Sequence, residues 1–177
     1  MYAASVVDID VAALKSAGYE ALMLDLDNTL LPWQSCDVPE SSRNWIERAK
    51  GLGMKLCIVS NTHNPKRLAK IAADLDVAFL SRALKPRIYG FEKAGKMLGC
   101  SLGRAVVVGD QILTDILGGN LAGMHTILVR PMHRREFVGT KISRLIERGI
   151  LVLLRCRGGH DLGTNSGRDK SEEQDTK

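Results

Sequence analysis

The sequence has 177 residues, of which 45% are hydrophobic, and a net charge of +5 at neutral pH. This length fits one globular domain, and the hydrophobic content is sufficient for a buried core. No apolar stretch approaches the roughly 20 residues of a membrane-spanning helix, and no signal-peptide pattern opens the chain, which argues against an integral membrane or exported protein and favours a cytoplasmic one. The cysteines form no Cys-x-x-Cys pair, so we expect reduced thiols at Cys36, Cys57, Cys100 and Cys156.

Short apolar runs alternate with segments of helical periodicity along the chain. In chain order we expect helix 10–17, strand 20–25, helix 40–51, strand 54–60, helix 65–74, strand 77–80, helix 87–98, strand 104–109, helix 114–121, strand 125–129 and helix 136–148. This alternation predicts parallel strands joined by helical crossovers. The expected fold is therefore α/β, with a doubly wound, mostly parallel five-stranded Rossmann-like sheet and helices on both faces.

The positive charge is concentrated towards the C-terminal end. Residues 130–157 contain 8 Lys or Arg and 2 Asp or Glu, whereas residues 1–129 contain 14 and 13. Within the basic part, residues 136–155 carry apolar side chains at roughly helical spacing, with basic side chains off that stripe. This segment either packs its apolar face on the domain or makes a peripheral contact with the anionic inner face of a membrane. Residues 158–177 are polar and glycine-rich, so we expect one domain over 1–157 and a disordered tail after it.

Acidic and polar side chains stand at or just past the C-terminal ends of four predicted strands. Asp25 and Asp27 end the first strand, and because alternate residues of a strand point to the same side, the two carboxylates would crowd one place. The others are Ser60 and Asn61 after the second strand, Lys85 after the third, and Asp110 and Asp115 after the fourth. In an open parallel sheet, ligands bind at this edge, where the strand order reverses.

These residue types together suit phosphoryl transfer. Carboxylates gathered in one crevice repel each other unless a cation lies between them, and oxygen ligands without His or Cys favour Mg²⁺. A lysine and a hydroxyl at the same edge suit a phosphate dianion. If the first and fourth of these strands are neighbours, Asp25, Asp27 and Asp110 converge on a Mg²⁺-dependent phosphate site.

The order of these motifs resembles that of the haloacid dehalogenase (HAD) superfamily of phosphotransferases. The matching pieces are DLDNT at 25–29, VSNT at 59–62, LKP at 84–86 and GDQILTD at 109–115. The longer run VGDQILTDILGGNLAGMHTILVRP, together with DLDNTLLPW, is similar to the YqeG-type class IIIA phosphatases, which are related to the phosphatidylglycerophosphate phosphatases. The resemblance covers about residues 15–150.

The resemblance implies a role for each matched residue. Asp25 is the nucleophile that becomes an aspartyl-phosphate. Asp27 is the acid and base that protonates the leaving oxygen and then activates water. Ser60, Asn61 and Lys85 bind the phosphoryl oxygens. The implied Mg²⁺ ligands are Asp25, Asp110, Asp115 and the backbone carbonyl of Asp27.

The resemblance also bears on the substrate. HAD enzymes that act on small metabolites often carry a cap domain, but the intervals from Asp27 to Ser60 and from Ser60 to Lys85 are each filled by about one helix and one strand. An uncapped site suits a large or surface-bound substrate such as a phospholipid head group. We therefore expect hydrolysis of phosphatidylglycerophosphate to phosphatidylglycerol.

Two alternatives stay open at this point. One is a phosphatase for a soluble nucleotide or sugar phosphate. The other is a polyanion-binding or RNA-binding protein with a vestigial HAD site, based on the basic C-terminal segment. The intact pair Asp25 and Asp27 counts against this second alternative. The aromatic content of 5% also offers few surfaces on which bases could stack, so nucleic acid is the less expected partner.

Overall fold

A computed structural model describes residues 1–132 of the chain. The elements in chain order are β1 (Tyr2–Ala3), η1 (Val6–Asp8), α1 (Val11–Ser16), β2 (Ala21–Leu24), α2 (Glu40–Gly51), β3 (Lys55–Val59), α3 (Pro65–Asp74), β4 (Ala78–Leu80), α4 (Ile88–Leu98), η2 (Leu102–Arg104), β5 (Ala105–Gly109), η3 (Ile112–Ile116), α5 (Leu117–Leu121) and β6 (His125–Val129). The predicted helix 136–148, the basic segment 136–155 and the tail 158–177 lie outside the described residues.

The strands form one parallel sheet in the order β1-β6-β5-β2-β3-β4. All five predicted strands are present, which confirms the parallel α/β fold. The sheet has a sixth strand that the sequence did not predict. Strand β1 is two residues long, and Tyr2 and Ala3 pair with Leu128 and Val129 of β6. Two residues are too few to show the alternation by which strands are recognised.

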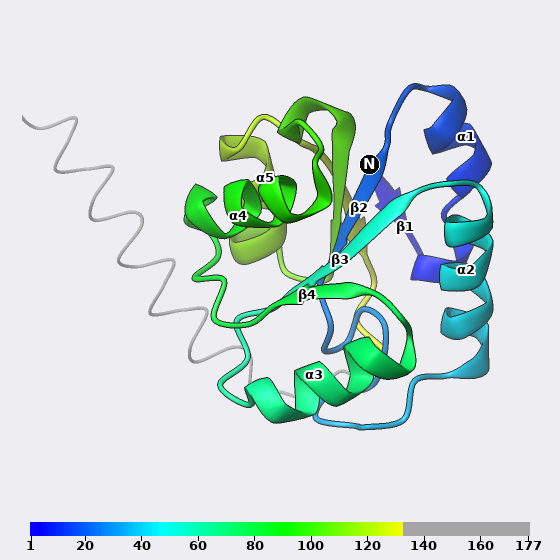
Figure 1. Cartoon of the computed structure of the whole chain (residues 1–177), viewed down its shortest axis with the longest axis vertical. Helices are drawn as coiled ribbons and strands as arrows, with labels where there is room; N and C mark the ends of the chain where they lie inside the picture. The colour runs from blue at the N-terminus through cyan, green and yellow to red at the C-terminus, as the bar shows by residue number, and fades with distance from the viewer. Residues whose placement is uncertain (133–177) are drawn as a thin grey trace, which may run out of the picture. The chain divides into compact units, whose positions relative to one another are not determined.

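Alternate residues of the central strand β2 face two separate cores. Leu22 and Leu24 point into a core shared with α1, α2 and α3, while Ala21 and Met23 point into a core shared with α4. Helix α5 packs on the second face through glycine, since a side chain at Gly119 would lie 3.0 Å from the side chain of Val107 in β5. Figure 1 shows α4 and α5 on one side of the sheet and α1 and α2 on the other. Helices therefore cover both faces, as predicted.

The strand order reverses at β2. From β2 the chain runs outward to β3 and β4, and it then crosses to β5 and β6 on the other side of β2. Leu24 is in register with both Ile58 and Val108, so these three strands end at the same edge of the sheet. That edge is where open parallel sheets bind their ligands.

The first turn of α3 lies at this edge and is fixed by local features. Asn64 accepts a hydrogen bond from the backbone N–H of Arg67 at 3.0 Å, and Pro65 occupies the first helical position. Both residue types are favoured at these positions. The turn is joined to the loop that follows β2, because Nε of Arg67 donates to the carbonyl of Ser35 at 2.8 Å.

Within residues 1–132, no helix is long and apolar enough to cross a bilayer.

Candidate active site

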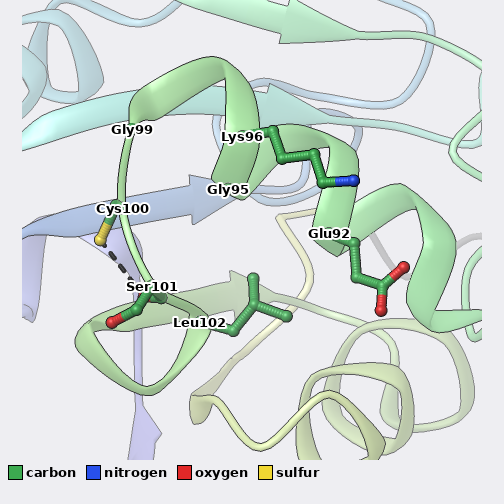
Figure 2. A pocket seen from close by; sticks show the side chains of 7 residues that line it. All are labelled: Glu92, Gly95, Lys96, Gly99, Cys100, Ser101 and Leu102. Atoms are coloured by element: carbon green, nitrogen blue, oxygen red, sulfur yellow. Dashed lines mark hydrogen bonds between the residues drawn. The ribbon is translucent and has the colours of Figure 1, made fainter.

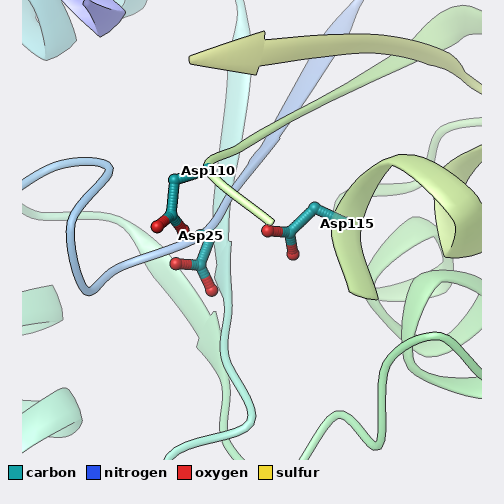
Figure 3. Close-up of side chains that lie close together, drawn as sticks. All are labelled: Asp25, Asp110 and Asp115. Atoms are coloured by element: carbon teal, nitrogen blue, oxygen red, sulfur yellow. The ribbon is translucent and has the colours of Figure 1, made fainter. Parts of the chain in front are cut away.

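The ends of β2 and β5 bring three carboxylates together. Asp25 follows β2 and Asp110 follows β5, and the backbone N–H of Asp25 donates to the carbonyl of Val108 at 2.9 Å. Asp115 lies one helical turn beyond, in η3. One carboxylate oxygen from each residue lies within 4.8 Å of the others. Figure 3 shows the three side chains pointing toward one another from the strand end and from η3.

Lys85 provides the positive charge at the centre of this cluster. Its Nζ donates to Oδ1 of Asp25 and to Oδ1 of Asp115, each at 2.6 Å, and all three side chains are almost completely buried. The backbone of Lys85 is held in turn by Asn61, whose Nδ2 donates to the Lys85 carbonyl at 2.9 Å and whose Oδ1 accepts from the Lys85 N–H at 2.8 Å. Asn61 therefore positions Lys85. A direct contact of Asn61 with phosphate stays a prediction.

Asp115 is fixed from two sides. Its Oδ1 accepts from Lys85, and its Oδ2 accepts from the backbone N–H of Gln111 at 3.1 Å. Gly109 makes room for it, because a Cβ at that position would overlap the Asp115 carboxyl group. A carboxylate with both oxygens engaged and no exposure is unlike an ordinary helix-capping residue.

Burial dominates the electrostatics of the cluster. It raises the pKa of Asp25 to about 7, an effect that Lys85 opposes and Asp115 reinforces. Burial, together with the charges of Asp25 and Asp115, also raises the pKa of Asp110 to about 7. Burial alone would lower the pKa of Lys85, but the charges of Asp115 and Asp25 outweigh it and raise that pKa. One ammonium thus does not balance three carboxylates, and additional positive charge would favour their ionised forms.

The residues present fit a divalent metal ion. Oδ1 of Asp110 is buried and has no hydrogen-bond partner within residues 1–132. An unpartnered buried carboxylate oxygen is costly. Carboxylate oxygens without nitrogen or sulfur ligands suit a hard cation such as Mg²⁺. Asp25, Asp110 and Asp115 could together hold such an ion.

Asp27 does not join this cluster through its side chain. Its carboxylate is bound by Arg67, with Nη1 donating to Oδ2 at 3.1 Å and Nη2 to Oδ1 at 2.8 Å. The backbone N–H of Gln34 donates to Oδ1 at 2.9 Å. Both members of the ion pair are largely buried. Arg67 is the candidate functional residue that the sequence analysis missed. One signal was available in the sequence. A basic residue in the first turn of a helix is unfavourable for the helix dipole, so its presence there indicates another role, such as binding a carboxylate.

Ser60 lies where it was expected, directly after β3. It is buried, and its Oγ accepts from the backbone N–H of Thr62 at 3.1 Å. The backbone N–H of Ser60 donates to the carbonyl of Leu80, which joins the ends of β3 and β4. The hydroxyl is therefore held at the same edge of the sheet as Asp25 and Lys85.

A separate pocket lies at the opposite end of β5 from Asp110. Figure 2 shows it at the C-terminal end of α4 and the connection to β5, with these lining residues: Glu92, Gly95, Lys96, Gly99, Cys100, Ser101 and Leu102. Its position at the N-terminal ends of the strands separates it from the carboxylate cluster. The pocket is therefore distinct from the candidate active site.

Comparison with known proteins gives matches over the same region. A family model described as HAD-hydrolase-like matches residues 83–133, which include Lys85, Asp110 and Asp115. The chain is 37% identical over 145 residues to the "Probable phosphatase YqeG" of Bacillus subtilis (strain 168), an alignment that covers 82% of this chain and 84% of that protein.

Two further matches concern a plant enzyme and a solved structure. The chain is 30% identical over 147 residues to phosphatidylglycerophosphate phosphatase 1, chloroplastic/mitochondrial, of Arabidopsis thaliana, covering 77% of this chain and 42% of that protein. It thus spans less than half of the plant protein. The fold is similar to that of the cobalt-bound deoxy-D-mannose-octulosonate 8-phosphate phosphatase (YrbI) from Haemophilus influenzae, with a TM-score of 0.53 and 16% identity over 63% of this chain and 68% of that one.

Proposed function

Because this chain belongs to the family of HAD-type phosphatases that includes YqeG, we propose that it hydrolyses a phosphomonoester with Mg²⁺ through an aspartyl-phosphate on Asp25. One observation carries the proposal. Asp25 and Asp115 both bind the buried ammonium of Lys85, Asp110 lies close to these two carboxylates, and one buried oxygen of Asp110 has no partner among the described residues. This is a site short of positive charge, as a metal-dependent phosphatase needs.

In the first step, an oxygen of Asp25 attacks phosphorus and forms a new P–O bond. The bond from phosphorus to the leaving oxygen breaks, and that oxygen takes a proton from Asp27, which gives the alcohol and an aspartyl-phosphate. Lys85, which already contacts Asp25, is placed to bind a phosphoryl oxygen at the same time. When bound, Mg²⁺ supplies the positive charge that keeps Asp25 ionised beside the anionic phosphate.

In the second step, water attacks the phosphorus of the aspartyl-phosphate. Asp27, now a carboxylate, takes the proton from water, and the bond between phosphorus and Asp25 breaks. The products are inorganic phosphate and the regenerated Asp25 carboxylate. A positioned acid and base of this kind typically contributes about 10²–10⁴-fold to the rate.

Arg67 controls the position from which Asp27 acts. A bidentate guanidinium contact suits a carboxylate and offers nothing to the protonated acid. Asp27 must therefore release at least one contact with Arg67 and carry a proton, taken from solvent or from the attacking water of the preceding turnover, before it can protonate the leaving oxygen. The pair can reform once that proton has been given up. Arg67 is in this sense a positioning residue, because it acts through Asp27.

The substrate we propose is phosphatidylglycerophosphate. The similarity to the Arabidopsis phosphatidylglycerophosphate phosphatase supports this choice. The open site also supports it, because within residues 1–132 the intervals between the motifs contain only α2 and β3, and then α3 and β4, with no further domain over Asp25. A lipid head group that stays at a membrane surface needs such an open approach. A peripheral contact of residues 136–155 with the same membrane stays a prediction from the sequence.

The test is Mg²⁺-dependent phosphate release from phosphatidylglycerophosphate in mixed micelles. Wild-type protein should release phosphate, and Asp25→Asn should release none. Asp37→Asn, an exposed carboxylate in the loop after β2, serves as the matched control and should keep full activity. If wild type cleaves only a water-soluble phosphomonoester, the lipid assignment fails while the phosphatase mechanism stands. If Asp25→Asn is as active as wild type, the mechanism itself is wrong.

A further inference from the structure

We propose that the rim of the active site docks on an anionic phospholipid bilayer. The site rim consists of six exposed apolar side chains on the loops and helix starts around the carboxylate cluster: Trp33, Leu84, Ile88, Tyr89, Ile112 and Leu117. This inference rests on the proposed function, and it names the surface that presents the substrate to Asp25.

The site rim follows from where these residues stand in the fold. Trp33 lies on the loop after β2, Leu84 and Tyr89 come after β4, and Ile112 comes after β5, so all follow the C-terminal ends of parallel strands. Leu84 directly precedes Lys85, and Ile112 is two residues past Asp110. Their exposed fractions are 55% for Leu84, 62% for Tyr89 and 61% for Ile112. Large apolar groups thus flank Lys85 and Asp110 of the proposed active site.

The segments that carry the site rim are packed together. A side chain at Gly118 would lie 2.9 Å from Cα of Pro86, so the start of α5 touches the loop that holds Lys85. The loop with Trp33 is tied to the start of α3 by the hydrogen bond from Arg67 to Ser35. The rim residues are therefore held by the same contacts that build the site.

Leu84 adds an independent observation. Its φ is +58°, in the left-handed region that side chains other than glycine rarely adopt. Because Leu84 is 55% exposed, the burial of its side chain in the core contributes little stability to offset this backbone strain. Strained residues cluster at functional sites, where the surrounding structure holds them in place. Here the neighbouring Lys85 is clamped by Asn61, so the leucine is kept pointing out beside the catalytic lysine.

The charge around the site rim favours an anionic bilayer over other apolar partners. The exposed charged side chains on the loops and helix starts 28–40, 61–66, 81–89, 111–117 and 130–132 are four basic and two acidic: Lys66, Arg82, Arg87, Arg130, Asp37 and Glu40. Basic groups are attracted to anionic head groups. Trp and Tyr side chains favour the boundary between water and hydrocarbon. Binding of a small soluble ester does not require exposed apolar and aromatic side chains together with basic ones around the phosphate site.

The test is flotation of the full-length chain with vesicles of phosphatidylcholine and phosphatidylglycerol, compared with vesicles of phosphatidylcholine alone. Two rim variants have exposed apolar controls at the opposite end of the sheet, near the C-terminal ends of α4 and α5. Tyr89→Ser and Ile112→Ser, at residues 62% and 61% exposed, are compared with Leu121→Ser and Met97→Ser, at residues 63% and 49% exposed. Each rim variant should raise the lipid concentration for half-maximal binding by roughly threefold to tenfold. The reason is that the variant removes an apolar side chain whose exposed part would be buried in the bilayer. The controls should stay within about twofold.

The outcomes separate docking from catalysis. The proposal would be overturned if the rim and control variants needed the same lipid concentration for half-maximal binding, because the protein would then bind vesicles through another segment. It would also be overturned if the wild-type protein bound no vesicles. Phosphate release from a water-soluble phosphomonoester is measured on the same four variants and should not change, since none of them touches the reacting atoms. If the rim variants lose vesicle binding but wild type hydrolyses no lipid phosphate, the substrate proposal fails and docking stands.

Discussion

Adding Mg²⁺ to the metal-free protein is expected to release protons, and the number released depends on pH. The pKa values of Asp25 and Asp110 are both raised to about 7, first by burial and then by neighbouring carboxylates. A bound divalent cation favours the ionised carboxylates. Protons that the metal-free site holds below pH 7 must therefore leave when the ion binds.

The magnitude follows from these two carboxyl groups. A group with a pKa of about 7 is about 90% protonated at pH 6 and about 10% protonated at pH 8. The two groups together should release about 1.8 protons at pH 6 and about 0.2 at pH 8. Because Asp25 and Asp110 interact, they titrate as a pair, and the total is the quantity predicted.

The assay is isothermal titration of Mg²⁺ at each pH in two buffers of different ionisation enthalpy. The dependence of the observed heat on the buffer enthalpy gives the number of protons released. Asp110→Asn should lower that number by about half at pH 6, because one of the two groups is gone. Asp37→Asn should not change it. No proton release at pH 6, or the same release at pH 6 and pH 8, would refute the assigned electrostatics.

The same linkage fixes the sign of the pH dependence of stability. The pKa of Asp25 is about 7 in the folded protein and 3.8 for the ordinary group, so the folded state binds the proton more tightly. The free energy of unfolding of the metal-free protein should therefore fall as pH rises from about 4 to 7, by a few kcal/mol for each such group at most, and stay level above that. Excess Mg²⁺ should reduce this decline in urea denaturation at pH 7.

Three further substitutions test other parts of the site. Arg67→Gln should lower kcat about tenfold or more for esters with poor leaving groups and much less for an activated nitrophenyl ester, with partial recovery in Arg67→Lys; equal losses on both esters would contradict the role given to Arg67. Lys85→Met should lower the free energy of unfolding by about 3 kcal/mol or more at pH 8 and by less at pH 5, where the carboxyl groups it leaves unpaired can be protonated, and the exposed Lys93→Met is the control. A loss that is the same at both pH values would argue against the ion pairs. Gly109→Ala should destabilise by about 1–3 kcal/mol, because the new Cβ overlaps the Asp115 carboxyl group. Gly103→Ala, which meets no atom within 4 Å, should change stability by less than about 1 kcal/mol, and similar values for the two would show that Asp115 is not tightly held.

The sequence predicted the sheet and the convergence of Asp25 with Asp110 because both follow from local pattern. A parallel sheet brings the C-terminal ends of its strands to one edge, so residues that follow strands β2 and β5 meet there whatever the details of the helices. The direction of the Asp115 side chain, into the cluster, depends on a local backbone conformation that the sequence pattern did not predict. An ordinary helix was expected over 114–121, whereas the chain forms a π-helical turn over Ile112–Ile116 before α5.

The contacts of Asp27 and Asn61 could not be predicted in this way. Arg67 lies 40 residues from Asp27, and no local spacing connects a carboxylate at a strand end to a guanidinium in the first turn of α3. Asn61 matched a phosphate-binding motif, yet both ends of its amide are engaged with the backbone of Lys85. Side-chain pairing across separate loops is set by the packed structure, and periodicity carries no information about it.

The central claim is that Asp25 carries the phosphoryl group during turnover, and acid-quenched protein tests it most directly. Asp27→Asn should slow the second step, since it removes the base that activates water. With an activated nitrophenyl ester, whose leaving oxygen needs little protonation, the first step should be affected less, so phosphorylated protein should accumulate after mixing with this ester and Mg²⁺. Peptide mass analysis should then find one phosphoryl group on the peptide that contains Asp25. The double variant with Asp25→Asn should carry none. Phosphate release with the phosphoryl group on another residue, or turnover with equal phosphorylation in the double variant, would contradict the mechanism.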